Sequence, residues 1–195
     1  ETALDGHVVA VDSVKAEGAK DMKLIVPKAT AKKLISMGVI DDVTLTYTKN
    51  SAVFKSDEYT IYTRLITGNY FPYQKMFTEG EINTCASRTA LIGAMTRAKM
   101  CTEEKQPAVF RIEDDVLNIS IRDKLVDYQE QVPLQETVCK SIRLGFDSKL
   151  VLETLKAFTC DNIALGFTSP RTPMIVEAED SDMKAMVLPV AIREA

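Results

Sequence analysis

The sequence has little of the chemistry that metal sites and most enzymes need. Its 195 residues include a single histidine, His7, and the four cysteines (Cys85, Cys101, Cys139 and Cys160) contain no C-x-x-C pair. Zinc sites use closely spaced cysteine and histidine ligands, so the thiols are expected to be buried or idle rather than metal-bound. No glycine-rich phosphate loop is present either. We therefore expect no metal, no cofactor and no catalytic residue.

Long apolar runs and an excess of positive charge are also missing. No apolar stretch approaches the length of a membrane span, and the first residues lack the pattern of a signal peptide. These features predict a cytoplasmic protein without a membrane partner. The net charge is −4, whereas small proteins that bind nucleic acid through bulk charge are usually basic. Any contact with nucleic acid is therefore expected to use a local basic surface.

What the chain does contain is a repeat. The stretch DDVTLTYT, residues 41–48, resembles DNIALGFT, residues 161–168, at an offset of 120 positions. Apolar residues alternate in both stretches, with Leu45 matching Leu165, as a half-buried strand requires. The alternation predicts one strand that occurs in two related units.

A helix is predicted before each copy of that strand. The two segments are PKATAKKLISMG, residues 27–38, and DSKLVLETLKAF, residues 147–158. Pro27 suits the first turn of a helix, and Asp147 or Ser148 suits an N-cap. The matching positions extend the repeat well beyond eight residues.

Each unit is predicted to run strand, strand, helix and then three strands. In the first unit the strand before the helix is KLIVPK, residues 23–28. The second unit has more in front: a strand at residues 81–87, a helix at 87–100 and a hairpin at 108–124 that turns at 113–115. Most counterparts of these elements would precede Glu1, so the chain is expected to begin inside its first unit.

The ordered set of motifs resembles the bacterial beta sliding clamp, the processivity subunit of the replicative DNA polymerase. The motifs are LDGHVVAV, TRLITGNYFPY, VLNISIRDKLVDYQEQVPL, IRLGFDSKLVLETLKAF, NIALGFTSPRTPMIV and MVLPV. The resemblance implies an α+β fold of repeated clamp domains, with helices on one face lining a DNA hole and antiparallel sheets outside. It implies a partial second domain at residues 1–78 and a complete third domain at residues 79–195.

The resemblance also implies a function. A clamp of this family is a non-catalytic, homodimeric ring that encircles duplex DNA without sequence preference. It tethers the polymerase catalytic subunit, the clamp loader and repair proteins through their short linear motifs. The alternative is a truncated or divergent clamp that acts only as a peptide-binding module.

A third and more remote reading is an enzyme that uses His7 as a base. Its motif, DGH at residues 5–7, is more typical of a turn that enters a strand, and no nucleophile motif or second histidine supports catalysis. Likewise, the acidic run EDD at residues 113–115 could hold a divalent cation, but its position between two alternating segments favours a hairpin turn.

Three surfaces follow from the resemblance. The residues that match the family's peptide-binding groove are Leu4, Gly6, His7, Val8, Val9, Leu150, Arg171, Pro173, Met186, Val187, Leu188, Pro189 and Val190. The family commonly has a basic residue where this chain has Val8. The residues that match the basic, DNA-facing sides of the helices are Lys28, Lys32, Arg88, Lys99, Lys149 and Lys156. Without the resemblance these would be ordinary solvated helix faces. The ring joint is expected at Met100 and Cys101, beside an edge strand at residues 127–132.

Overall fold

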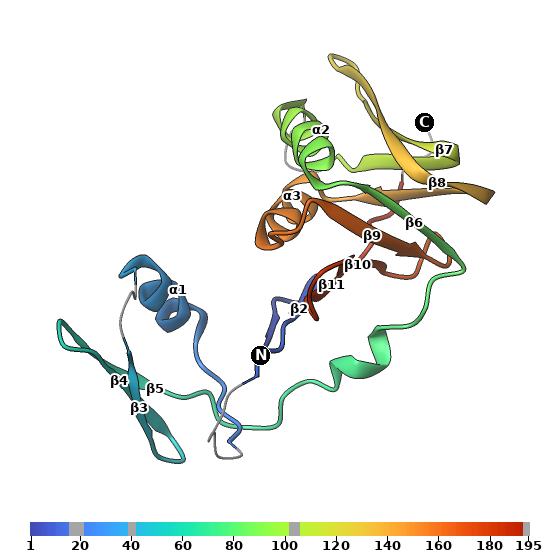
Figure 1. Cartoon of the computed structure of the whole chain (residues 1–195). Coiled ribbons are helices and arrows are strands. Elements are labelled where there is room, and N and C mark those ends of the chain that lie inside the picture. Colours follow the sequence, from blue (N-terminus) through green and yellow to red (C-terminus); the bar gives the residue numbers. More distant parts are fainter. Residues whose placement is uncertain (16–21, 39–41, 102–105, 193–195) are drawn as a thin grey trace. The chain divides into compact units, whose positions relative to one another are not determined.

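The chain divides into two compact units, shown in Figure 1, a computed structural model that describes residues 1–15, 22–38, 42–101 and 106–192. The larger unit comprises residues 1–15 and 73–195, and the smaller unit comprises residues 16–72. The first strands of the chain thus pack with its C-terminal part. The domain limits of 1–78 and 79–195 concern the family repeat rather than packing, and they stay a prediction.

The smaller unit contains one helix and a three-stranded sheet. Helix α1 spans Lys28–Ser36, and strands β3 (Thr44–Tyr47), β4 (Ser51–Lys55) and β5 (Thr60–Arg64) form an antiparallel meander. Pro27 lies at the N-cap of α1, one position before the first turn in which it is expected. Of the repeated stretch that begins at Asp41, the first residue lies outside the described residues.

The strand predicted at residues 23–28 is not a strand. The backbone of residues 22–27 forms no ladder, and Ile25 accepts one hydrogen bond at its carbonyl from the N–H of Ile66, at 2.9 Å. A strand needs a series of such bonds with a neighbour. A short apolar run, Leu24 to Val26, was therefore insufficient to predict a strand.

The larger unit is built on an eight-stranded sheet in the order β1-β2-β11-β10-β9-β6-β8-β7. Its elements are β1 (Thr2–Leu4), β2 (Val8–Val11), the 3₁₀ helix η1 (Tyr73–Met76), β6 (Ile82–Ser87), α2 (Arg88–Cys101), β7 (Ala108–Arg122), β8 (Asp127–Phe146), α3 (Ser148–Ala157), β9 (Asn162–Phe167), β10 (Met174–Ala178) and β11 (Lys184–Val187). The predicted strand at 81–87 and the helix at 87–100 are confirmed within a residue or two.

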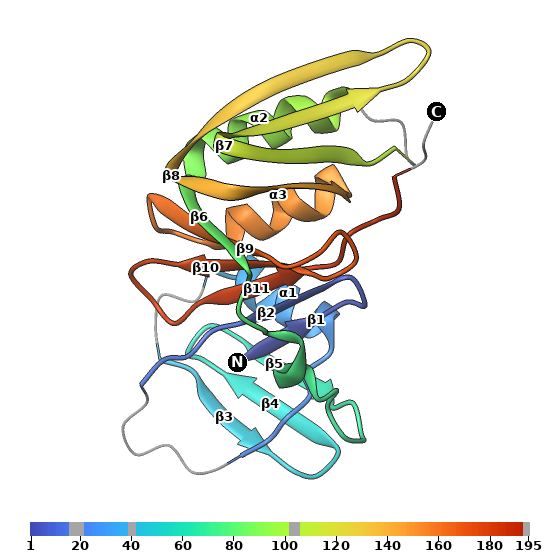
Figure 2. The ribbon, with the colours of Figure 1, turned by 90° about the vertical axis from the view of Figure 1, so that its right-hand side faces the viewer.

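The main core of this unit lies between the two helices and one face of the sheet. In Figure 2 helices α2 and α3 lie behind the sheet, and η1 lies in front of it. Leu91 and Met95 of α2 and Leu155 of α3 are almost completely buried, together with Leu165 and Phe167 of β9. Both helices therefore cover the same side of the sheet, and the strands form the opposite surface.

The predicted repeat is confirmed from the helix onward, whereas the two strands predicted before each helix are not reproduced in both units. Helix α1 leads into the meander β3-β4-β5, and α3 leads into the meander β9-β10-β11, with helix starts at Lys28 and Ser148 that are 120 positions apart. The predicted N-cap is Asp147, whose carboxylate accepts hydrogen bonds from the N–H groups of Lys149 (2.8 Å) and Leu150 (3.2 Å). The α+β class is confirmed with it.

The hairpin predicted to turn at residues 113–115 turns elsewhere. Strand β7 continues through this acidic segment as far as Arg122, and the chain reverses at Asp123–Val126, where the two residues exchange backbone hydrogen bonds. The acidic segment is an irregularity of the β7–β8 ladder, with register shifts on both sides of Asp114 and a positive φ of 52° at that residue. Aspartate tolerates this conformation better than most residues do, so the run interrupts the ladder without ending the strand.

Candidate peptide-binding and DNA-facing surfaces

An apolar cluster lies on the sheet face opposite the helices. It consists of Val9, Ile175 and Met186, which are buried, and of the partly buried Val11, Tyr73, Met76, Phe77 and Leu188. Val9 pairs with Met186, and Met186 pairs with Ile175, so the three buried residues form one row across β2, β11 and β10. Because side chains alternate along a strand, Val8 and Val187 in the next row point into the main core instead.

The helix η1 supplies the other wall of the apolar cluster. The rings of Tyr73 and Phe77 meet edge to face, with centroids 6.4 Å apart. The Nζ atom of Lys184 lies 5.1 Å from the centroid of the Phe77 ring, a cation–π geometry at the rim of the cluster. Partly exposed aromatic and methionine side chains of this kind suit an adaptable apolar binding surface.

Leu188 joins the cluster because the β2–β11 ladder continues past the strand end. The N–H of Leu188 donates to the carbonyl of His7 at 2.9 Å, which fixes its side chain on the same face as that of Met186. Strand β11 ends at Val187, two residues before Pro189, which has no N–H to donate. Val190 then forms an isolated bridge with Gly145.

The structure gathers some of the predicted groove residues and separates others. Val9, Met186 and Leu188 share the apolar cluster, with His7 beside them through its carbonyl. Val8, Val187 and Leu150 belong to the main core, on the other face of the sheet. The rest lie in strand β1 or in connecting segments: Leu4, Gly6, Arg171, Pro173, Pro189 and Val190. A single groove bounded by both Leu150 and Leu188 would have to include both faces of the sheet.

Sequence reasoning missed the residues that complete the cluster. Tyr73, Met76 and Phe77 lie in the segment FPYQKMF, which reads as a boundary between units because its apolar periodicity lapses. The usable signal was the density of aromatic and methionine residues there. Val11 follows from alternation along β2 once Val9 is placed, whereas Ile175 requires the pairing of β10 with β11.

The DGH motif forms a turn between β1 and β2. Gly6 has a φ of 92°, a conformation that a glycine adopts without strain. The carboxylate of Asp5 accepts hydrogen bonds from the N–H groups of His7 (3.1 Å) and Val8 (3.0 Å). Asp5 therefore supports the backbone of the turn, and the motif has a structural role that needs no catalytic chemistry.

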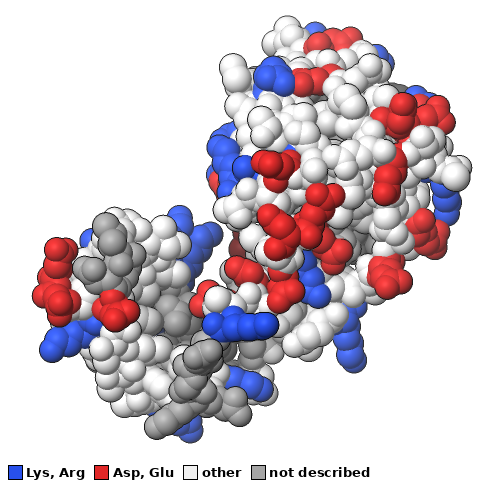
Figure 3. Space-filling view, viewed as in Figure 1, with Lys and Arg blue, Asp and Glu red and all other residues white. Residues whose placement is uncertain are grey.

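The predicted DNA-facing residues are distributed over all three helices. Lys28, Lys32, Lys99, Lys149 and Lys156 are exposed. Arg88 is less accessible, because its Nε donates to the carbonyl of Cys160 at 2.7 Å and ties the start of α2 to the segment between α3 and β9. On α3, Glu153 lies on the same side as Lys149 and Lys156, and the face seen in Figure 3 mixes both signs of charge.

The predicted ring joint lies at the end of α2. Met100 is 82% exposed, whereas Cys101 packs against the main core. The neighbouring part of β8 is braced to α2: Arg97 Nε donates to Glu130 Oε2 at 2.8 Å, and the Tyr128 hydroxyl donates to the carbonyl of Ala94 at 2.9 Å. The assignment of this region as an oligomer joint stays a prediction.

Electrostatics within this brace are consistent with a stable charged pair. The hydrogen bond from Arg97 holds the pKa of the Glu130 carboxyl below its usual range. Burial, followed by the hydrogen bond to Glu130, raises the pKa of Tyr128, so its hydroxyl keeps its proton at neutral pH. The brace therefore consists of a guanidinium, a carboxylate and a neutral phenol.

Two further findings concern the described residues only. They contain no group of three or more histidine, cysteine or acidic side chains placed to hold a metal ion. No helix among them has the length and apolar character needed to cross a membrane.

Comparison with known proteins identifies the family. Residues 76–191 match the family described as DNA polymerase III beta subunit, C-terminal domain. A beta sliding clamp of Staphylococcus aureus (strain Mu50) is 26% identical over 198 residues, and one of Staphylococcus epidermidis is 23% identical over 197 residues. Each alignment covers 97% of this chain and 52% of the relative, so the chain spans about half the length of these clamps.

Solved structures share the fold. A putative DNA polymerase III beta subunit from Eubacterium rectale superposes with a TM-score of 0.89 at 23% identity, covering 98% of this chain and 54% of that one. A sliding clamp from Pseudomonas aeruginosa bound to griselimycin gives 0.88 at 20% identity, with the same coverage. With the match over residues 76–191, these likenesses lead to one conclusion: the chain belongs to the DNA polymerase III beta subunit family, the sliding clamps, and corresponds to their C-terminal part.

Proposed function

We propose that this chain serves as the peptide-binding part of a DNA polymerase sliding clamp and that the apolar cluster holds the partner. The clamp would encircle duplex DNA in the cytoplasm as a homodimeric ring and support replication. Sliding clamps are non-catalytic polymerase subunits, so the role is to keep a polymerase near its template, an effective-concentration effect. The polymerase catalytic subunit, the clamp loader and repair proteins would compete for the cluster through short linear motifs.

The observation that carries this proposal is the apolar cluster itself. Its row of Val9, Met186 and Ile175 is rigid because it belongs to a sheet, whereas Phe77, Met76 and Leu188 remain partly accessible. A short peptide gains most of its affinity from a few buried anchors. Leucine and phenylalanine side chains suit this surface, which is lined with aliphatic, thioether and aromatic groups.

Related clamps support a ligand-binding role for the fold. The Pseudomonas aeruginosa structure contains griselimycin. The structure of the C. crescentus beta sliding clamp has PEG bound at a region described as its beta-motif tethering region. These ligands belong to those proteins, and their presence encourages a direct test on this chain.

The test is a titration of a labelled peptide with adjacent leucine and phenylalanine residues. We expect Leu188→Ala and Phe77→Ala each to weaken binding by about 1–3 kcal/mol, the usual worth of a buried apolar contact. Leu150→Ala and Lys149→Glu, on the helix side of the sheet, should leave affinity unchanged. The cluster assignment fails if the folded Leu188→Ala protein binds normally while the Leu150→Ala protein does not.

The alternative is a peptide-binding module that does not act on DNA. Sliding requires contacts with phosphates that are weak, independent of sequence and sensitive to salt. If Lys149 and Lys156 each contact a phosphate, the double substitution to glutamine should lower the slope of log K against log salt concentration by about 2. An unchanged slope would favour the module, provided that peptide binding is intact in the same protein.

A further inference from the structure

A lysine side chain lies at one end of the apolar cluster. Lys184, the first residue of β11, pairs with Val11 of β2 and with Glu177 of β10. These three residues form the row next to the buried row of the cluster, on the same face of the sheet. Val11 is itself a member of the cluster, and Leu188 lies beyond the other end of β11. Along β11 the cluster therefore runs from a cationic end to an apolar end.

The ammonium of Lys184 rests on an aromatic ring of the cluster. Its Nζ lies 5.1 Å from the centroid of the Phe77 ring, and both side chains are half-buried. A cation–π contact restricts the lysine side chain before any ligand arrives, so that less conformational entropy is lost on binding. The ring face attracts the charge without accepting a conventional hydrogen bond. The three N–H donors of the ammonium thus stay available to a ligand.

Lys184 has no acidic partner among the residues that the structure describes. None of the four ion pairs found there includes it, although Glu177 lies directly across the β10–β11 ladder and is exposed. The lysine rests on Phe77 instead, which directs its charge toward η1 and the cluster. Its position is therefore that of a cation at the rim of an apolar surface.

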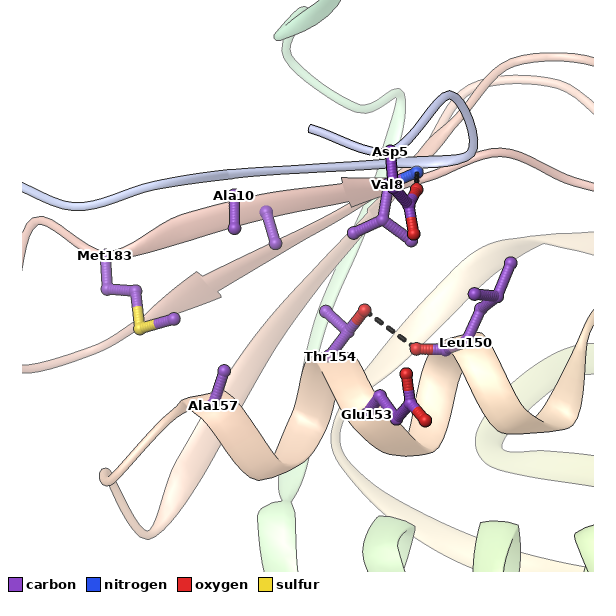
Figure 4. Close-up of a pocket in the computed structure, with 9 residues that line it drawn as sticks. Asp5, Val8, Ala10, Leu150, Glu153, Thr154, Ala157 and Met183 are labelled. Atoms are coloured by element: carbon purple, nitrogen blue, oxygen red, sulfur yellow. Dashed lines mark hydrogen bonds between the residues drawn. The ribbon is translucent and has the colours of Figure 1, made fainter. Parts of the chain in front are cut away.

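The other face of the sheet carries the opposite charge. A hollow between α3 and the strands β2 and β11 is lined by the exposed carboxylates Asp5 and Glu153, and the described residues that line it include no lysine or arginine (Figure 4). Carboxylates there repel an acidic ligand, whereas Lys184 attracts one. Charge at the rim of an interface contributes chiefly to specificity. A negatively charged peptide is therefore directed to the face that carries the apolar cluster.

We propose that Lys184 makes the apolar cluster selective for peptides that carry an aspartate or glutamate beside their apolar anchors. This inference rests on the proposed peptide-binding function and adds the charge of the partner to it. Neighbouring rows on one face of a strand are about 7 Å apart. An acidic side chain about two residues away from the anchor that covers Met186 can therefore reach the ammonium of Lys184.

The test uses the 195-residue chain and four labelled peptides, acetylated and amidated so that no terminal charge contributes. All share the core glycine–leucine–phenylalanine–glycine. One carries an aspartate before the core, another carries it after the core, and the remaining two have asparagine at these positions. We expect at least one aspartate peptide to bind about three- to fivefold more tightly than its asparagine counterpart, with an advantage that shrinks as salt is added. Equal affinities within both pairs would overturn the proposal.

Three variants assign the preference to one side chain. Lys184→Gln should remove the advantage of aspartate, whereas Lys184→Arg, which keeps the charge and the aromatic contact, should retain it. Lys124→Gln removes the same charge from an exposed residue of the β7–β8 turn, at the other edge of the sheet, and should retain it fully. The proposal is wrong if the advantage survives in folded Lys184→Gln or is lost equally in Lys124→Gln.

Glu177 offers a change in the opposite direction. Its carboxylate competes with the peptide for Lys184, so Glu177→Gln should raise the advantage of aspartate about twofold. A smaller advantage in this variant would contradict the proposal.

The asparagine peptides test the underlying function separately. Their binding, and its weakening by Leu188→Ala, reports on the apolar cluster without the acidic group. If they bind and aspartate brings no advantage, the peptide-binding function stands and the role of Lys184 is refuted. If none of the four peptides binds, both are refuted.

Discussion

The helix-and-meander arrangement occurs twice in the chain, and the two copies are packed very differently. In the larger unit, α3 buries Val151, Leu152 and Leu155 against the sheet and α2. In the smaller unit, α1 has no buried residue, and Ile35, which matches Leu155 in the repeat, is 80% exposed. The same order of elements therefore coexists with two levels of burial.

Neighbouring elements account for the difference. In the larger unit, β6 pairs with the outer edge of β9, and α2 packs against α3. The second copy therefore has a neighbour for its sheet and another for its helix. Among the described residues of the smaller unit, the sheet has three strands and α1 is the only helix. Local sequence sets the order of helix and strands, whereas burial depends on which segments lie beside them.

The largest expected effect comes from truncating the two matched apolar side chains, Leu155 of α3 and Ile35 of α1, because their burial differs most. Leu155→Ala should lower the free energy of unfolding by about 2–5 kcal/mol, because it leaves a cavity in the main core. Ile35→Ala should change it by less than about 0.5 kcal/mol, because the side chain is already solvated. Urea denaturation followed by circular dichroism measures both, and similar losses in the two variants would show that the burial difference is wrong.

The helix starts offer a second and smaller contrast. Asp147 caps α3 with its side chain, whereas Pro27 at the same position of α1 makes no side-chain cap. Asp147→Ala should cost about 1 kcal/mol of stability. Asp147→Asn, which keeps an acceptor oxygen, should recover most of this loss in the same denaturation experiment. If the asparagine variant is as unstable as the alanine variant, the cap is not the cause.

The smallest expected effect concerns charge. All four ion pairs among the described residues lie in the larger unit, including Arg97–Glu130 between α2 and β8. The pKa of Glu130 is lowered in the folded state, so its stabilising contribution is present above the ordinary carboxyl pKa. It is lost as the pH falls through the lowered value.

Unfolding measured from pH 7 down to pH 3 tests this contribution. Wild type should lose about 1 kcal/mol or less relative to Glu130→Gln over that range, because the pair is near the surface. The control is Glu58→Gln, which lies in the smaller unit and should follow the wild-type curve. If the Glu130→Gln and wild-type curves are parallel, the Arg97–Glu130 pair does not stabilise the folded state.

Sequence reasoning found the elements more readily than their environment. The helices around Leu155 and Leu91 follow from apolar periodicity, and the offset of 120 residues predicted the repeated helix and meander. It failed at residues 113–115, where an acidic run resembles a turn but Asp114 absorbs the irregularity through a positive φ. It also failed at residues 23–28, where the backbone of the apolar run forms no ladder in the described structure and Ile25 accepts one hydrogen bond, from Ile66.

The candidate site was also predicted only in part. Val9, Met186 and Leu188 were identified by resemblance, and the structure places them in one cluster. Leu150 was assigned to the same groove, although strand alternation and the position of α3 put it on the other face. Phe77 was missed because a 3₁₀ helix followed by an irregular segment has no periodicity to read. Which face of a sheet a residue occupies depends on register, and register requires the partner strand.

Amide hydrogen exchange of the two copies, read by mass spectrometry, tests the central claim most directly. Amides of α3 and β9–β11 should exchange only through global unfolding, because their helix and strands are buried in the main core. Amides of α1 and β3–β5 should exchange faster by local opening, with protection lower by a factor of at least about ten. Equal protection in residues 28–36 and 148–157 would contradict the account, since it would mean that the two copies are packed alike.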